Sequence, residues 1–159
     1  MGVIYSVRVR RLITLISEEV AVEGYRFRLT GTVPSECRSC KLYRVCIGNL
    51  KLGIEYMVVA VRRVKHYCPL LGSYVRVVEV EPQPIELAVE DSMAVQDIVF
   101  TYRAKGCRDS SCPAYRLCNN RLIEGTKLKI ISVSSEKFSC RYYGLVRKVL
   151  CIPVDYLLS

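Results

Sequence analysis

The sequence predicts a mainly β protein built from two tandem pseudo-repeats, each a cysteine loop followed by a β-hairpin or small sheet. Three observations predict this fold class: an internal repeat, several segments in which apolar and polar side chains alternate, and two similarly spaced sets of four cysteines. Alternation with a period of two residues is typical of half-buried strands. Helices are expected to be short and to lie in the cysteine loops.

The repeat appears when residues 40–68 are moved forward by 72 positions onto residues 112–140. Nine of these 29 aligned residues are identical, whereas unrelated sequences of average composition match at roughly one position in 16. The match continues with one residue deleted, and Cys37 corresponds to Cys107 after a two-residue insertion. This duplication predicts four segments: an N-terminal β-strand region over 1–36, a first four-cysteine repeat over 37–84, connecting strands over 85–106 and a second four-cysteine repeat over 107–159.

Strands are expected where apolar residues alternate with polar ones or where β-branched residues are concentrated. Gly53 and Gly125 are expected in the turns before two of these strands. The expected strands are Val3 to Val9 and residues 25–29, 56–61, 74–80, 127–133 and 146–152.

The two sets of cysteines have the composition and spacing of metal sites. In each set three cysteines lie close together in the sequence and the fourth comes from a distant strand, an arrangement that can surround a tetrahedral ion or a cubane. Zinc ribbons present two pairs of closely spaced cysteines, and the second pair is missing here, so two iron–sulfur clusters of the 4Fe-4S type are favoured. Two zinc ions and disulfide bonds are the alternatives. The sets are Cys37, Cys40, Cys46 and Cys68, and Cys107, Cys112, Cys118 and Cys140.

Two further residues have chemistry that a metal site can use. Cys151 aligns with Val80 in a strand, so it is expected to be a buried core residue. His66 stands two residues before Cys68, but its repeat partner Phe138 cannot bind a metal. His66 is therefore expected at the surface, facing solvent or RNA, rather than as a ligand.

Composition predicts a globular, cytoplasmic protein. Hydrophobic residues make up 51% of the chain, which allows an apolar interior, and no apolar run reaches the roughly 18 residues that span a bilayer. The start of the chain lacks the apolar segment of a signal peptide. A single histidine makes a Ser-His-Asp triad unexpected, and no phosphate-binding glycine motif is present.

Charge favours a polyanionic partner, because 24 Lys and Arg against 15 Asp and Glu give a net charge of +9. Cations that bind phosphates, with tyrosines that stack on bases, are how β-rich modules hold RNA. The sequence thus predicts a non-enzymatic RNA-binding protein, associated with the ribosome or a ribonucleoprotein. The alternatives are an iron–sulfur electron-transfer protein and a structural-zinc scaffold that binds proteins. The expected RNA-binding residues are Arg8, Arg10, Arg62, Arg63, Lys65, Arg141, Tyr142, Tyr143, Arg147 and Lys148.

Several segments together resemble a known family. They are Leu12-Ile13-Thr14-Leu15-Ile16, Pro34 with the three cysteines that follow it, the strand Val75 to Val80, and Cys112-Pro113-x-Tyr115-x2-Cys118. From about Leu12 to Asp155 the chain resembles the uncharacterised archaeal protein family 0179. That resemblance implies an archaeal cytoplasmic protein with cysteine-rich repeats, and it implies no activity. The C-x2-C-x5-C loop alone also resembles the cluster loop of the endonuclease III class of DNA glycosylases.

Overall fold

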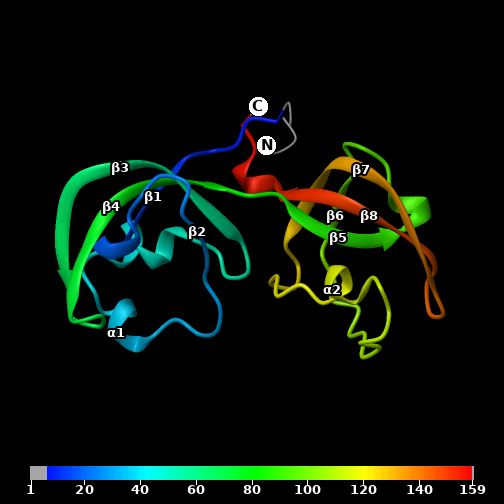
Figure 1. Ribbon diagram of the computed structural model, residues 1–159, viewed down its shortest axis with the longest axis horizontal. Coiled ribbons are helices and arrows are strands. Elements are labelled where there is room, and N and C mark those ends of the chain that lie inside the picture. Colours follow the sequence, from blue (N-terminus) through cyan, green and yellow to red (C-terminus); the bar gives the residue numbers. More distant parts are fainter. Residues whose placement is uncertain (1–6, 159) are drawn as a thin grey trace. The chain divides into compact units, whose positions relative to one another are not determined.

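The computed structural model describes residues 7–158 and contains two four-stranded antiparallel sheets with only short helical turns (Figure 1). The chain divides into an N-terminal unit, Arg10–Gln83, and a C-terminal unit, residues 84–158, which also includes residues 7–9. The predicted fold class, mainly β with two repeats, is confirmed. None of the described residues forms a helix that is long and apolar enough to cross a membrane.

The N-terminal unit is a sheet with the strand order β1-β4-β3-β2 and with its cysteine loop between β2 and β3. The short elements marked η are 3-10 turns. In chain order the elements are β1 (Leu12–Ser17), η1 (Glu18–Val20), β2 (Arg26–Arg28), α1 (Ser35–Arg38), η2 (Tyr43–Val45), η3 (Ile47–Asn49), β3 (Glu55–Cys68) and β4 (Ser73–Pro82).

The C-terminal unit has the same topology, with the strand order β5-β8-β7-β6 and its cysteine loop between β6 and β7. Its elements are β5 (Ile85–Glu90), η4 (Asp91–Met93), β6 (Val99–Thr101), α2 (Tyr115–Cys118), β7 (Lys127–Cys140), β8 (Gly144–Pro153) and η5 (Val154–Tyr156).

The duplication covers each unit completely, including the strands before the cysteine loops. The elements β5, η4 and β6 start 73 residues after β1, η1 and β2. At matching positions Gly24 has a φ of 88° and Asp97 a φ of 71°. Their backbone N–H groups donate equivalent hydrogen bonds, from Gly24 to the carbonyl of Val58 and from Asp97 to that of Ile130, both at 2.8 Å. The backbone is therefore repeated even where the side chains differ.

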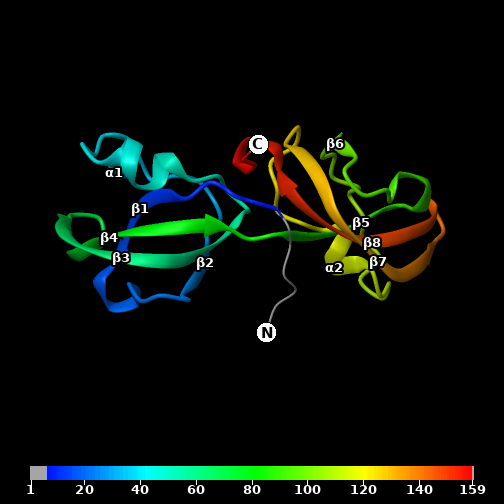
Figure 2. The ribbon, with the colours of Figure 1, turned by 90° about the horizontal axis from the view of Figure 1, so that it is seen from above.

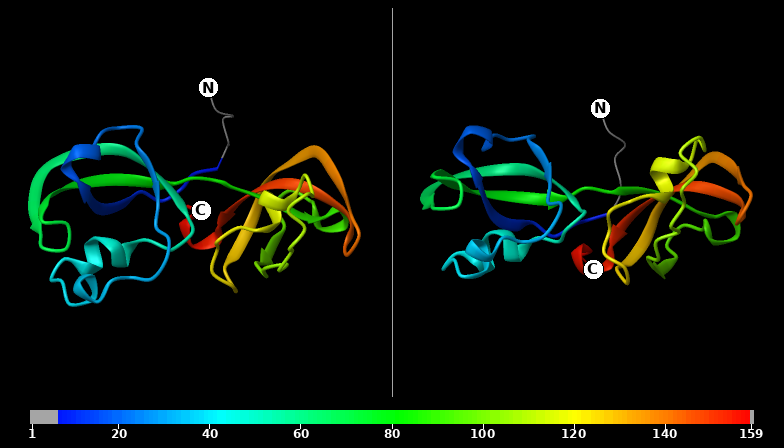
Figure 3. Two further views of the ribbon diagram at one scale, coloured as in Figure 1. Left: turned by 60° about the horizontal axis from the view of Figure 1, so that its bottom comes forward. Right: turned by 90° about the horizontal axis from the view of Figure 1, so that it is seen from below.

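The longest elements are the β3–β4 and β7–β8 hairpins, which Figure 3 shows as pairs of long curved strands. Both hairpins have register shifts at matching positions, which bend the strands. In the first hairpin Cys68 pairs with Ser73, and in the second Cys140 pairs with Gly144. The one-residue deletion between the repeats therefore lies in the turn, where it leaves the strand register unchanged.

Each sheet buries one set of alternating side chains, as expected for strands with one face in a core. In the first unit Tyr56, Val58 and Val78 are almost completely buried, and in the second Leu128, Ile130 and Val149 occupy equivalent places. Cys151 has no exposed surface, and burial raises the pKa of its thiol to about 12. The prediction that Cys151 is a core residue is confirmed.

Of the expected strand over Val3 to Val9, the structure describes only residues 7–9, and these do not form a strand. Val3 and Tyr5 lie outside the described residues, Val9 forms a single bridge with Leu157, and the first strand within residues 7–158 begins at Leu12. Arg8 and Arg10 are exposed and precede this strand.

Candidate metal centres

In the N-terminal unit the cysteine loop covers the free edge of β1 (Figure 2). Ile13 and Leu15 are two residues apart, so their carbonyl groups point to the same edge. The side-chain amide of Asn49 donates to the Ile13 carbonyl at 2.6 Å, and the Cys46 thiol faces the Leu15 carbonyl at 3.6 Å. The buried hydroxyl of Thr14 donates to the carbonyl of Cys46 at 3.1 Å. These contacts hold Cys46 against the sheet.

The C-terminal unit repeats this arrangement with one exchange. The side-chain amide of Asn120 donates to the Glu86 carbonyl at 3.0 Å, as Asn49 does to that of Ile13. The next carbonyl on this edge, that of Ala88, accepts a hydrogen bond from the Lys105 ammonium at 2.7 Å. Lys105 therefore occupies the place that the Cys46 thiol has in the first unit.

The first quartet brings together the end of a hairpin strand and three positions in the loop. Cys37 lies in α1 and Cys68 ends β3. Burial raises the pKa of the Cys37 thiol, and the nearby sulfurs of Cys68 and Cys40 and the carboxylate of Glu36 raise it further. Burial also raises the pKa of Cys46, which is close enough to Cys37 and Cys68 to be affected by both. Cys37 therefore lies near Cys40 and Cys68, and Cys46 lies near Cys37 and Cys68.

The second quartet lines one cavity of about 320 Å³. Cys112, Cys118 and Cys140 pack against a small apolar cluster of Ala88, Ala114 and Val146. Burial raises the pKa of the Cys118 thiol; the Lys105 ammonium opposes this rise, and the other three sulfurs of the quartet add to it.

The donor set of both quartets fits a thiolate-bound metal, although the side chains are not gathered around a point. All nine cysteines are free thiols. Within residues 7–158, no three His, Cys, Asp or Glu side chains are arranged to hold a metal ion. A single zinc ion with sulfurs at 2.3 Å requires sulfur–sulfur separations of about 3.8 Å. Binding one ion would therefore draw the loop sulfurs inward, whereas a cubane has its thiolates farther apart.

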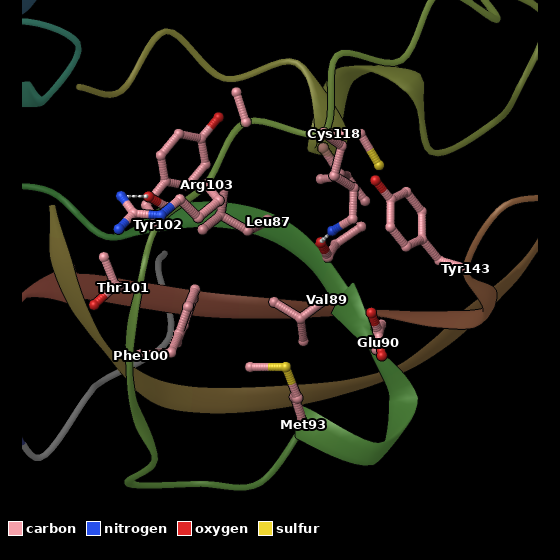
Figure 4. A pocket seen from close by; sticks show the side chains of 14 residues that line it. Leu87, Val89, Glu90, Met93, Phe100, Thr101, Tyr102, Arg103, Cys118 and Tyr143 are labelled. Atoms are coloured by element: carbon pink, nitrogen blue, oxygen red, sulfur yellow. Dashed lines mark hydrogen bonds between the residues drawn. The ribbon is translucent and has the colours of Figure 1, made fainter. Parts of the chain in front are cut away.

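A second cavity, of about 270 Å³, lies beside the second quartet and shares Lys105, Cys118 and Tyr143 with the first cavity. Figure 4 looks into it, with Cys118 and Tyr143 on one side and Phe100 on the other. Lys105 lies over the Tyr143 ring, 5.4 Å from its centroid. The two cavities therefore meet at the lysine that contacts the edge strand.

Four of the eight basic residues expected at an RNA interface form ion pairs within their own unit. Arg62 pairs with Glu79 at 3.3 Å and Lys65 with Glu18 at 2.7 Å. In the C-terminal unit Arg147 pairs with Asp91 at 2.7 Å, and Lys148 pairs with two glutamates, Glu86 at 3.5 Å and Glu136 at 3.2 Å. These four cations help to hold strands together and are less available to phosphates than unpaired ones.

The remaining expected residues are exposed or lie near the hairpin turns. Arg63 and Arg141 are exposed, and the side chains of Tyr142 and Tyr143 are 70% and 41% exposed. His66 is half-buried in β3, opposite Val75.

Four exposed arginines in the cysteine loops were missed as candidates. Arg38 and Arg108 each follow the first cysteine of a quartet, and Arg44 and Arg116 match in the 72-residue register. Aligning the loops on their cysteines would have found both pairs. The asparagines that tie the loops to the edge strands have no comparable signal, because Asn49 and Asn120 are 71 residues apart.

Comparison with known proteins gives one consistent result. Residues 12–151 match the model of the Uncharacterised protein family (UPF0179). A UPF0179 protein of Methanocaldococcus jannaschii is 35% identical over 144 residues, which is 90% of this chain and 95% of the relative. A UPF0179 protein of Pyrococcus abyssi is 40% identical over 123 residues, 77% of this chain and 84% of the relative. No solved structure matches. The chain belongs to the UPF0179 family, whose similar relatives are archaeal.

Proposed function

We propose that this protein binds two metal centres, one at each cysteine quartet, and that the loops fixed by these centres bind RNA in the cytoplasm. One observation carries the metal proposal: two quartets with the same chain order are each attached to the free edge of a sheet by an asparagine, Asn49 or Asn120. Both the four cysteines and the asparagine that anchors their loop are repeated. This is expected of a metal site, because supporting contacts orient the residues that bind the metal.

The loops themselves contain little regular secondary structure. Apart from α1 and α2, of four residues each, they contain only short turns and coil. Segments of this length lack an apolar core of their own, and four metal–thiolate bonds supply folding free energy directly. Iron–sulfur clusters remain our first choice over zinc, since neither quartet has the two-knuckle spacing of zinc ribbons.

Metal analysis of protein purified without oxygen tests this proposal. We expect two metal centres per chain, with broad absorption near 400 nm if they are iron–sulfur clusters. Cys46→Ser should remove the first centre and Cys118→Ser the second, whereas Cys151→Ala should leave both in place. Full metal content in the Cys46→Ser variant, or a loss caused by Cys151→Ala, would show that the ligands are assigned wrongly.

For RNA binding, the support comes from exposed arginines that form no ion pair with any carboxylate among residues 7–158. Arg38, Arg44, Arg108 and Arg116 are exposed in the two cysteine loops, where a bound metal would fix their backbone. The exposed Tyr142 ring offers a stacking surface beyond the fourth cysteine of the second quartet. Partners of this chemistry include ribosomal RNA and other structured RNA.

Salt dependence with a matched pair of variants tests the RNA proposal. Arg116→Gln and Lys148→Gln remove the same charge, but Lys148 already pairs with two carboxylates. We expect Arg116→Gln to weaken binding to total RNA and to flatten the log–log salt slope by about 0.7–0.9. Lys148→Gln should change the slope less. Equal effects of the two substitutions would indicate a nonspecific dependence on net charge.

Electron transfer is the second candidate, and one contact favours it. The backbone N–H of Leu42 lies 3.4 Å from the sulfur of Cys40. Hydrogen bonds to cluster sulfurs are among the features that set reduction potential. Reversible reduction at a defined potential, together with RNA affinity that is insensitive to Arg116→Gln, would support this function in place of RNA binding.

A further inference from the structure

We propose that Lys105 makes the second quartet the tighter of two inequivalent metal sites, so that the first quartet releases its metal before the second. This inference rests on the proposed metal binding. Its basis is the exchange on the edge strands: the Leu15 carbonyl faces the Cys46 thiol, and the equivalent Ala88 carbonyl accepts a hydrogen bond from Lys105.

The exchange matters because the metal-bound form of each site is anionic. Four thiolates on a divalent ion give a net charge of about −2. A cation beside such a centre stabilises it by direct Coulomb attraction, which is stronger in partly buried surroundings than in water. Lys105 lines the cavity that all four cysteines of the second quartet share, so its ammonium lies close enough to attract an anionic metal centre there.

Lys105 is also fixed in place and not neutralised. Its ammonium donates to the Ala88 carbonyl at 2.7 Å and lies over the Tyr143 ring. Among residues 7–158, no carboxylate forms an ion pair with it. Gly106, which has a φ of 63°, connects Lys105 to Cys107. A side chain in this position can respond to a charge in the cavity without breaking another ion pair.

At the first quartet the corresponding groups act in the opposite direction. Aligning Cys37 with Cys107 places Ser35 opposite Lys105 and Glu36 opposite Gly106, so the first site has an acidic neighbour and lacks the lysine. When Cys46 binds metal as a thiolate, it no longer has a proton to donate to the Leu15 carbonyl, 3.6 Å away. A negative sulfur then faces a carbonyl oxygen, which weakens this site relative to the second.

Staged removal of zinc from the full-length protein tests the inference. Zinc-loaded protein is exposed to increasing chelator, and the thiols set free are alkylated and located by mass spectrometry. The first quartet should become labelled at a chelator concentration roughly tenfold lower than the second, a ratio in the range of a single partly screened charge contact. Lys105→Gln should remove most of this difference, and Lys105→Arg should keep it. Lys41→Gln, the same loss of charge in the first loop, should not close the gap.

A second variant covers the case in which Lys105→Gln fails to fold. Glu36→Gln removes the acidic neighbour of the first quartet. It should therefore raise the chelator concentration at which the first quartet releases zinc, bringing it closer to that of the second. Simultaneous release from both quartets in the wild-type protein would overturn the inference while leaving metal binding intact. Failure of zinc to protect either quartet from alkylation would instead overturn zinc binding at these sites and the inference with it, whereas the metal analysis of anaerobically purified protein tests the iron–sulfur centres separately.

Discussion

Replacing Asn120 with alanine should loosen the second cysteine loop without unfolding its sheet. The substitution removes the hydrogen bond from the Asn120 side chain to the Glu86 carbonyl, at 3.0 Å, and a longer contact with the Leu117 carbonyl at 3.5 Å. One neutral hydrogen bond contributes about 0.5–1.5 kcal/mol net. Because Asn120 is only half-buried, water can replace part of the contact, and we expect a cost of about 1 kcal/mol.

That cost has a local consequence which hydrogen exchange can measure. A loss of about 1 kcal/mol raises the population of the opened loop roughly fivefold, so amides over residues 107–120 should exchange about five times faster. The neighbouring Asn119 is the control, since its side chain donates to the Tyr115 carbonyl at 2.8 Å, within the same loop. Asn119→Ala should leave the attachment to β5 intact. If both variants speed exchange in the loop equally, the asparagine is not an anchor.

Further outcomes follow from the repeat and its ion pairs. Asn49→Ala should loosen residues 37–50 as Asn120→Ala loosens its own loop, measured by the same exchange experiment. Asp97→Gly should raise the denaturation midpoint, because glycine adopts the left-handed backbone conformation at this position without strain; the gain in stability is up to about 1 kcal/mol. Gly24→Ala should lower the midpoint by a similar amount, because it introduces that backbone strain although the added carbon has open space around it. Arg147 lowers the pKa of Asp91, so this pair stabilises the fold above the carboxyl's ordinary pKa and the effect is lost as pH falls through the lowered value. Asp91→Asn should therefore flatten the acid side of a stability-versus-pH curve, and an unchanged curve would contradict the assignment.

The sequence predicted the strands well because their side chains carry a clear period. The segments 56–61 and 74–80 both lie within observed strands, and their buried residues alternate with less buried ones over 56–58 and 78–80. The expected segments were shorter than β3 and β7, in which residues 61–65 and 135–137 are exposed on both faces. Without burial there is no alternation to detect.

The full extent of the repeat was not predicted, for a reason visible in the alignment. The offset between the units is 73 residues at β1 and β5, 70 at Cys37 and Cys107, 72 from Cys40 to Cys68, and 71 between β4 and β8. Each change of register interrupts a comparison made at one fixed period. The equivalence of Gly24 and Asp97 is one of backbone conformation, which residue identity does not report.

The roles of the charged residues also depended on the fold. Glu18 and its ion-pair partner Arg76 are 58 residues apart in the sequence. Folding brings such distant groups together, so the sequence alone does not show which cations are paired. A count of cations near Cys68 or Cys140 therefore overstated the charge available to a ligand. Only the topology could identify which arginines remain unpaired.

The cysteine loops also protect two sheet edges through which copies of this chain could aggregate. A sheet edge with unpaired backbone groups is a template onto which another chain can add a strand. β1 and β5 are such edges, and the loops occupy them through Asn49 and Asn120. Whatever holds the loops in place therefore also keeps the edges closed. If the proposed metal centres hold the loops, removing the metal would expose two strand-pairing sites per chain, and we expect concentration-dependent aggregation before the sheets unfold.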